Sequence, residues 1–268
     1  MGICLAYGGV MDIFERMNTK ILYLGDTTLD TAASYLAGVM KHFKIDFDYR
    51  PSDQAFIDDL LAKDYAVMII SDYPGSNFTA EQLEAVAEKV KAGMGLLMLG
   101  GWESFTGANH EYTDTPLKDV LPVVMQPSDD RINSSGPCLI EKSVDHEIVA
   151  GLPFEKHTPG IGGFNRFQSK PGANTILWSR QFRAFLKEGD DFEFEPFAEA
   201  EPLLVVSNYG KGRTCAFATD AAPHWVGGLV DWGDARVESQ AEGAEAIEVG
   251  NWYAQFFANM VKWTARQI

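Results

Sequence analysis

The chain has 268 residues, 46% of them hydrophobic and 22% charged, which is enough to bury a sizeable core. Its formal net charge of −16 repels phosphate backbones and anionic lipids, which argues against nucleic-acid and membrane partners, and no apolar run reaches the roughly 18 residues of a membrane span. Three cysteines at wide spacings, with no CxxC pair, fit a reducing cytosol and predict a cytoplasmic protein without a disulfide framework.

The first half of the chain alternates strands with helices. Residues 1–18 lack regular pattern and are expected to be a flexible leader before a single domain over residues 19–268. The expected strands are Ile21–Asp26, Asp46–Pro51, Tyr65–Tyr73 and Gly95–Leu99. Asp30, Ser52 and a Thr79–Gln82 capping box are expected to start the three intervening helices. This order predicts an α/β fold with a mostly parallel sheet and helices on both faces, the long apolar strands lying inside it.

The second half has a weaker helical signal. Short strands among Gly/Pro loops are expected at residues 138–142, 163–167 and 174–179. The acidic run over residues 188–201 is typical of an exposed loop or hairpin. Residues 201–220 predict two strands joined by a tight turn, and a helix with a buried aromatic stripe is expected from about 249 to 266.

Ligands of parallel sheets bind outside the carboxyl ends of the strands. Asp26, Asp72 and Tyr73 lie at the carboxyl ends of predicted strands and are therefore candidate ligand-binding residues. The next strand ends in two glycines, where Gly101 permits close backbone approach and Trp102 is expected to form a pocket wall.

Two residues in this last turn are candidate catalytic groups. Ser104 is a candidate nucleophile if His110 or His224 lies within hydrogen-bond reach, and otherwise a cap for a short following helix. Glu103 is a candidate general base, or a solvated or arginine-paired carboxylate. The residues expected to line one cleft are Asp26, Asp72, Trp102, Glu103, Ser104, Asp220 and His224.

Asp220 and His224 form a D-x-x-x-H pair after a predicted strand. Such a pair can act as an acid–base dyad or bind a metal, but further ligands are not evident, so no metal is expected. The alternative is a turn aspartate that accepts backbone N–H bonds. Arg166 either anchors an anionic ligand or forms a structural salt bridge. The glycine-rich segments lack the strand–loop–helix context of a phosphate loop, and no cofactor is expected.

Four segments together resemble those of a known family: GGWESFTG, DHEIVAGLP, GFNRFQSKPGA and PLLVVSNYGKGRTCAFATDAAPHW. From about Ile21 to the C-terminus, their order and spacing resemble the glutamine amidotransferase domain family of the class I glutamine amidotransferase-like superfamily. The DHEIVAGLP and GKGR segments also resemble trehalose-utilisation-type relatives. The resemblance implies a flavodoxin-like sheet with a β-rich insertion in the second half, in mostly uncharacterised cytoplasmic proteins.

The resemblance also implies a catalytic pattern from which this sequence departs. In active class I enzymes a G-x-C-x-G turn presents a cysteine nucleophile, and a downstream histidine is followed two residues later by glutamate. Here the turn is Gly100–Ser104 without a cysteine, and His224 is followed by Trp225 and Val226.

Two hypotheses follow from this departure. The favoured one is a domain that has lost the Cys-His-Glu triad, does not hydrolyse glutamine, and binds an unidentified small molecule or protein. The other is a hydrolase that uses Ser104 or the Asp220–His224 pair. Whether the chain forms a homo-oligomer stays open.

Overall fold

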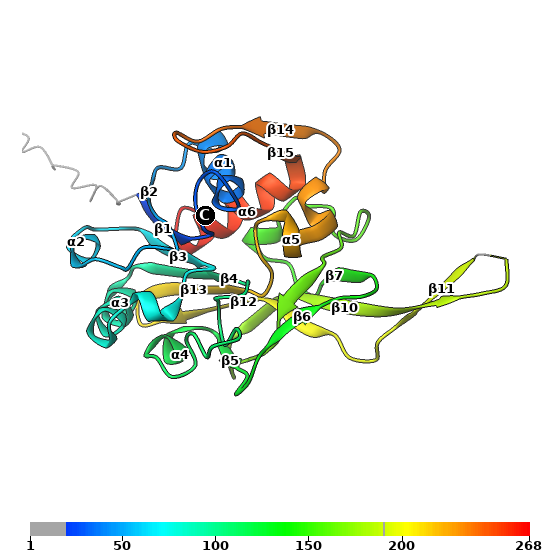
Figure 1. Cartoon of the computed structure of the whole chain (residues 1–268), viewed down its shortest axis with the longest axis horizontal. Coiled ribbons are helices and arrows are strands. Elements are labelled where there is room, and N and C mark those ends of the chain that lie inside the picture. The colour runs from blue at the N-terminus through cyan, green and yellow to red at the C-terminus, as the bar shows by residue number, and fades with distance from the viewer. Residues whose placement is uncertain (1–19, 190) are drawn as a thin grey trace, which may run out of the picture.

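A nine-stranded sheet organises the molecule (Figure 1). The computed structural model describes residues 20–189 and 191–268, so the expected leader lies outside the described residues. Five neighbouring strands of the sheet are parallel: β2 (Phe47–Arg50), β1 (Ile21–Gly25), β3 (Val67–Ser71), β4 (Gly95–Leu99) and β13 (Gly212–Phe217). Every residue of β1, β3 and β4 is buried, and each of these strands has a neighbour on both sides. The predicted parallel sheet with its three internal strands is therefore confirmed.

Helices cover both faces of the parallel strands. One face carries α1 (Ala33–His42) and α6 (Asn251–Thr264), and the other carries α3 (Ala80–Ala92) (Figure 1). Phe217 of β13 packs against the α6 rings of Phe256 and Phe257, with ring centroids 5.4 and 5.7 Å apart. The aromatic stripe of α6 is thus core, as expected.

One of the three predicted helix starts is confirmed. The Thr79 hydroxyl accepts from the Gln82 N–H while the Gln82 side chain accepts from the Thr79 N–H, which is the predicted capping box. Asp30 does not cap α1, because that helix starts after Ala32. Ser52 does not start a helix either. The short α2 (Asp58–Leu61) begins later, and the Ser52 hydroxyl accepts from the Thr27 N–H instead.

Antiparallel strands continue the sheet beyond β13. β12 (Glu201–Tyr209) forms the predicted hairpin with β13, and β10 (Asn174–Leu186) pairs with β12, β7 (Cys138–Lys142) and β11 (Phe192–Pro196). The strand expected at residues 174–179 is therefore much longer, and the acidic run folds as the β11 side of a hairpin. The outer parts of β10 and β11 form an arm that projects from the rest of the molecule (Figure 1).

Short elements complete the structure. Two-stranded sheets are formed by β5 (Val123–Met125) with β9 (Phe167–Ser169), by β6 (Arg131–Asn133) with β8 (Gly163–Asn165), and by β14 (Arg236–Ser239) with β15 (Ile247–Gly250). The short helices are α4 (Leu117–Val120), α5 (Pro223–Val226), η1 (Gly75–Asn77), η2 (Glu147–Val149) and η3 (Gly227–Asp231). Among the described residues, none of the helices combines the length and apolar character of a membrane span.

Candidate functional site at the carboxyl edge of the sheet

The ends of three parallel strands bring three carboxyl groups together. Asp26 follows β1, Asp72 follows β3, and Asp220 lies three residues after β13. One carboxylate oxygen from each lies within 4.8 Å of the other two. Asp26 and Asp220 are buried, whereas Asp72 is partly exposed, so Asp72 connects this carboxyl cluster to the surface. The sequence placed each residue at this edge, and the parallel order of the strands brings their carboxyl groups close together.

Hydrogen bonds hold one oxygen of each carboxyl group. Asp26 Oδ2 accepts from the hydroxyls of Ser71 at 2.6 Å and Tyr23 at 3.0 Å. Asp72 Oδ1 accepts from the Glu103 N–H at 2.7 Å. Asp220 Oδ1 accepts from the two N–H groups that follow it, as the turn interpretation expected. The backbone N–H of Trp102 also acts on the Asp72 carboxyl group, so all three groups are held at the strand ends by local donors.

Burial raises the pKa of all three carboxyl groups. The pKa of Asp26 rises to about 6, limited by the hydrogen bonds from Ser71 and Tyr23. The pKa of Asp72 rises to about 8, first through desolvation and then through the negative charge of Asp26. Desolvation and the charges of both neighbours raise the pKa of Asp220 well above its usual value. The cluster therefore retains protons near neutral pH and would release them on binding a cation.

The backbone at these strand ends is constrained. Asp26 and Asp72 have positive φ angles of 50° and 43°, in the left-handed region that aspartate tolerates better than most residues. Gly25, with φ 119°, lies so close to β3 that an added Cβ would be 1.6 Å from the Ser71 carbonyl oxygen. Tight contact between β1 and β3 is therefore what brings Asp26 and Asp72 together.

Asn165 and Asp130 hold the turn after β4. Asn165 accepts from the Gly101 N–H at 2.8 Å and donates to the Gly101 carbonyl at 3.0 Å and to Asp130 at 2.8 Å. Asp130 also accepts from the N–H groups of Thr106 and Gly107. A Cβ on Gly101 would lie 2.0 Å from Asp72 Oδ1, so glycine is needed where this turn meets the cluster. Sequence reasoning missed Asn165 and Asp130, because nothing local links them to this turn.

Ser104 is completely buried at the base of this turn. Its hydroxyl oxygen accepts from the Asp72 N–H at 3.2 Å, and no histidine contacts it among the described residues. No helix follows it, so the helix-capping alternative is wrong. The positive φ angles of this segment belong to Phe105, at 52°, and Gly107, at 53°, and not to any residue from Gly100 to Ser104.

An exposed aromatic surface lies beside the cluster. Trp102 is 51% exposed, the Arg131 guanidinium lies 4.6 Å from its ring centroid, and the His224 ring is 6.3 Å away. His224 belongs to α5, which starts three residues after Asp220. No hydrogen bond joins Asp220 to His224 in the described part of the chain. Glu103 is partly buried, and desolvation and the charge of Glu111 raise the pKa of its carboxyl group.

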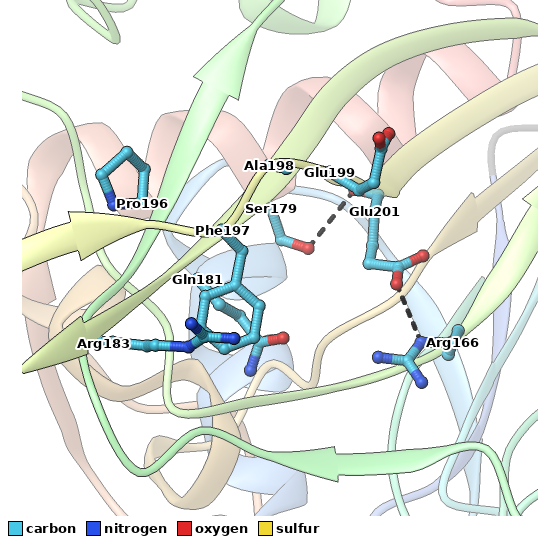
Figure 2. Close-up of a pocket in the computed structure, with 9 residues that line it drawn as sticks. All are labelled: Arg166, Ser179, Gln181, Arg183, Pro196, Phe197, Ala198, Glu199 and Glu201. Carbon is cyan, nitrogen blue, oxygen red and sulfur yellow. Dashed lines mark hydrogen bonds and ion pairs between the residues drawn. The ribbon is translucent and has the colours of Figure 1, made fainter.

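Tyr73 and Arg166 lie apart from these contacts. Tyr73 is buried, with its hydroxyl donating to the Gln54 carbonyl at 2.7 Å. Arg166 lines a different hollow, of about 440 Å³, at the base of the β10–β11 arm (Figure 2). Its Nε lies 2.9 Å from Glu201 Oε1, so the salt-bridge alternative has direct structural support. Arg183 lines the same hollow, its guanidinium 5.0 Å from the Phe197 ring centroid.

The two described cysteines are buried in strands away from the turn. Cys138 lies in β7 and Cys215 in β13. Burial raises the pKa of the Cys138 thiol to about 12 and raises that of Cys215 as well. Both are therefore neutral thiols near pH 7 and poor nucleophiles in this structure.

The three carboxyl groups are a donor set of the kind that hard divalent cations take, since such ions prefer oxygen ligands. From the sequence no metal was expected, because ligands beyond Asp220 and His224 were not evident. The same oxygens could equally accept N–H bonds from an organic ammonium group.

Comparison with known proteins identifies the family. Residues 23–237 match a family model described as "Putative glutamine amidotransferase". No curated protein matches the chain. Among solved structures, Cytoplasmic Protein STM3548 from Salmonella typhimurium is 25% identical, with TM-score 0.67, covering 91% of this chain and 98% of that one. Cytoplasmic Protein STM1381 from Salmonella typhimurium LT2 is 26% identical, with TM-score 0.66 and coverages of 91% and 99%.

A third solved structure is similar to this chain in fold alone. The mmIFT52 N-terminal domain is 11% identical to this chain, with TM-score 0.53, covering 91% of this chain and 96% of that one. The family match spans the parallel strands β3, β4 and β13, the end of β1, and all three members of the carboxyl cluster. The chain belongs to the glutamine amidotransferase-like family.

Proposed function

We propose that this chain is a cytoplasmic, non-hydrolysing member of its family, and that it binds a small cationic ligand at the carboxyl cluster. The observation that carries the proposal is the environment of Ser104. Its hydroxyl is buried and accepts a backbone hydrogen bond from Asp72, without the histidine base that a serine nucleophile needs. Attack on a carboxamide therefore lacks a competent nucleophile at this turn.

The carboxyl groups of the site are suited to binding a cation. Three carboxyl oxygens converge, each group is fixed through its other contacts, and Asp72 opens to the surface next to exposed Trp102. A cation at this point would displace the retained protons and relieve the repulsion between the carboxylates. Trp102 would cover an apolar or planar part of an organic ligand. The ligand class is therefore a divalent metal ion or an organic amine.

The hydrolase alternative needs a different arrangement. Asp220 would have to orient His224, but Asp220 Oδ1 is occupied by backbone N–H groups and the His224 ring faces Trp102. A nucleophilic Ser104 would have to leave its buried position.

The first experiment measures ammonia release from glutamine by the purified full-length chain. We expect no release above a buffer blank, with Ser104→Ala and Cys138→Ala giving the same result. Robust turnover that Ser104→Ala abolishes would establish the hydrolase alternative. Turnover abolished only by Cys138→Ala would place the nucleophile elsewhere in the chain.

The second experiment measures the melting temperature with Mg²⁺, Mn²⁺ or Ca²⁺ in one arm and with putrescine in the other. We expect either the metal ions or putrescine to raise the melting temperature of the wild type, and to leave the melting temperature of Asp72→Asn unchanged. Asp145→Asn, whose side chain is exposed and distant from the cluster in sequence, is the matched control and should behave like wild type. If neither probe acts, or if Asp72→Asn responds like wild type, the binding proposal is wrong.

A further inference from the structure

The β10–β11 arm has one face made only of apolar side chains. Its cross-strand pairs alternate between two faces, because directly paired residues of antiparallel strands point the same way. Three pairs form the arm's apolar face: Phe182 with Pro196, Ala184 with Phe194, and Leu186 with Phe192. The opposite, charged face carries Arg183, Phe185, Lys187, Glu193 and Glu195.

This apolar face is exposed. Leu186 is 66% exposed, Phe192 63% and Phe194 51%, and the rings of Phe192 and Phe194 stack with centroids 6.4 Å apart. Beyond Gln181, β10 pairs only with β11, so the arm is a two-stranded ribbon that projects from the sheet (Figure 1). A two-stranded ribbon has only marginal stability in water unless another layer packs against it. The structure therefore contains an apolar surface that needs a partner.

We propose that a second copy of this chain covers the arm's apolar face, forming a two-fold dimer of stacked arms. The charges of the chain leave this face as the place where a second copy would bind. The chain carries a net charge of −16, so two copies repel each other through most of their surfaces. The apolar face has no charged side chain, and on the opposite face Lys187 pairs with Glu193 at 2.5 Å while Arg183 lies across from Glu195. Stacked apolar faces keep all of these charges in solvent.

The shape of the face is also self-complementary. Small Ala184 lies directly across the ribbon from large Phe194. A two-fold axis along the arm puts β11 of one copy over β10 of the other, so that each Phe194 ring covers the Ala184 of the partner. The same rotation places Phe192 over Leu186 and Pro196 over Phe182. The contact is isologous, so the pairing of a large Phe194 ring with a small Ala184 side chain forms twice in the dimer.

The β11 edge of the arm does not favour the alternative of strand addition. Pro196 has no N–H to donate, and Glu193 and Glu195 in the same strand would meet the identical glutamates of an antiparallel copy. Face-to-face stacking is thus the contact that the arm's chemistry supports.

The test is the molar mass of the full-length chain by sedimentation equilibrium at micromolar concentrations. We expect a dimer for the wild type. Phe194→Glu should raise the dimer dissociation constant by at least about tenfold, because it places a carboxylate in the centre of the apolar contact. Phe185→Glu is the matched control, since it makes the same change at an exposed phenylalanine on the charged face, and it should leave the constant within about threefold of wild type.

Circular dichroism of both variants checks that they fold. A wild-type monomer at these concentrations, including one that needs another protein to cover its arm, overturns the proposal. Equal effects of Phe194→Glu and Phe185→Glu would also overturn it, because the contact would then not involve the apolar face.

Discussion

The carboxyl cluster and the arm are opposite departures from the usual distribution of polar and apolar groups within one sheet. At the cluster, titratable side chains are buried where the parallel strands end. On the arm, large apolar side chains are exposed where the antiparallel strands run beyond the body. Both departures cost folding free energy when nothing is bound, so each marks a surface that a ligand or partner would stabilise. The two regions differ in how they are packed: the cluster is surrounded by the core, whereas each strand of the arm pairs only with the other.

The largest difference in stability between the two regions should appear when a glycine in each is replaced by alanine. Gly25→Ala puts a Cβ 1.6 Å from a backbone oxygen at a φ of 119°, so β1 and β3 would have to separate. We expect a loss of about 3 kcal/mol or more in the free energy of unfolding. Gly189→Ala, in the turn of the arm, has positive φ but no neighbour within 4 Å and should cost about 1 kcal/mol.

Urea unfolding of both glycine variants measures this difference. Equal losses would mean that the contact between β1 and β3 is not what supports the cluster.

An intermediate effect should appear in the pH dependence of stability. The folded-state pKa of Asp72 is raised from 3.8 to about 8, so the folded chain binds its proton more tightly than the unfolded chain does. The contribution of Asp72 to stability should therefore fall as pH rises from about 4 through about 8, and level off above that range. Asp72→Asn keeps the oxygen that accepts from Glu103 and tolerates the positive φ, but it cannot ionise.

We expect Asp72→Asn to be more stable than wild type at pH 8, by on the order of 1 kcal/mol, and to show a shallower slope between pH 5 and 8. Urea unfolding at several pH values measures this. A variant less stable than wild type at pH 8 would show that the ionised carboxylate contributes favourably, against the direction of the pKa shift.

The smallest effect should come from the arm. Phe194→Glu removes little buried area within one copy, because this side chain is already about half exposed. We expect the unfolding free energy of the monomer to change by less than about 0.5 kcal/mol. Thermal unfolding at concentrations low enough to dissociate the dimer is the measurement. A large loss would mean that the arm packs on its own body and is not a free ribbon.

Local sequence patterns were sufficient for most of the secondary structure. The apolar runs of β1, β3 and β4, the capping box at Thr79 and the β12–β13 hairpin each depend on residues close in sequence. The helix starts at Asp30 and Ser52 were wrong because capping residues are common in loops, and Ser52 instead bonds to the loop after β1. The motif resemblance in turn predicted the family to which the chain belongs.

The sequence by itself determined that Asp26, Asp72 and Asp220 lie at strand ends, because each follows a strand of recognisable pattern. The sequence also led to the expectation of one shared cleft, but only the tertiary structure decided that an oxygen of each carboxyl group lies within 4.8 Å of the others. The order β13-β4-β3-β1 sets which strand ends are near one another. Tertiary packing likewise buried Ser104, moved Arg166 to a separate hollow and brought Asn165 to Gly101. The arm's two faces depend on the register of β10 with β11, because a shift of one residue would exchange them.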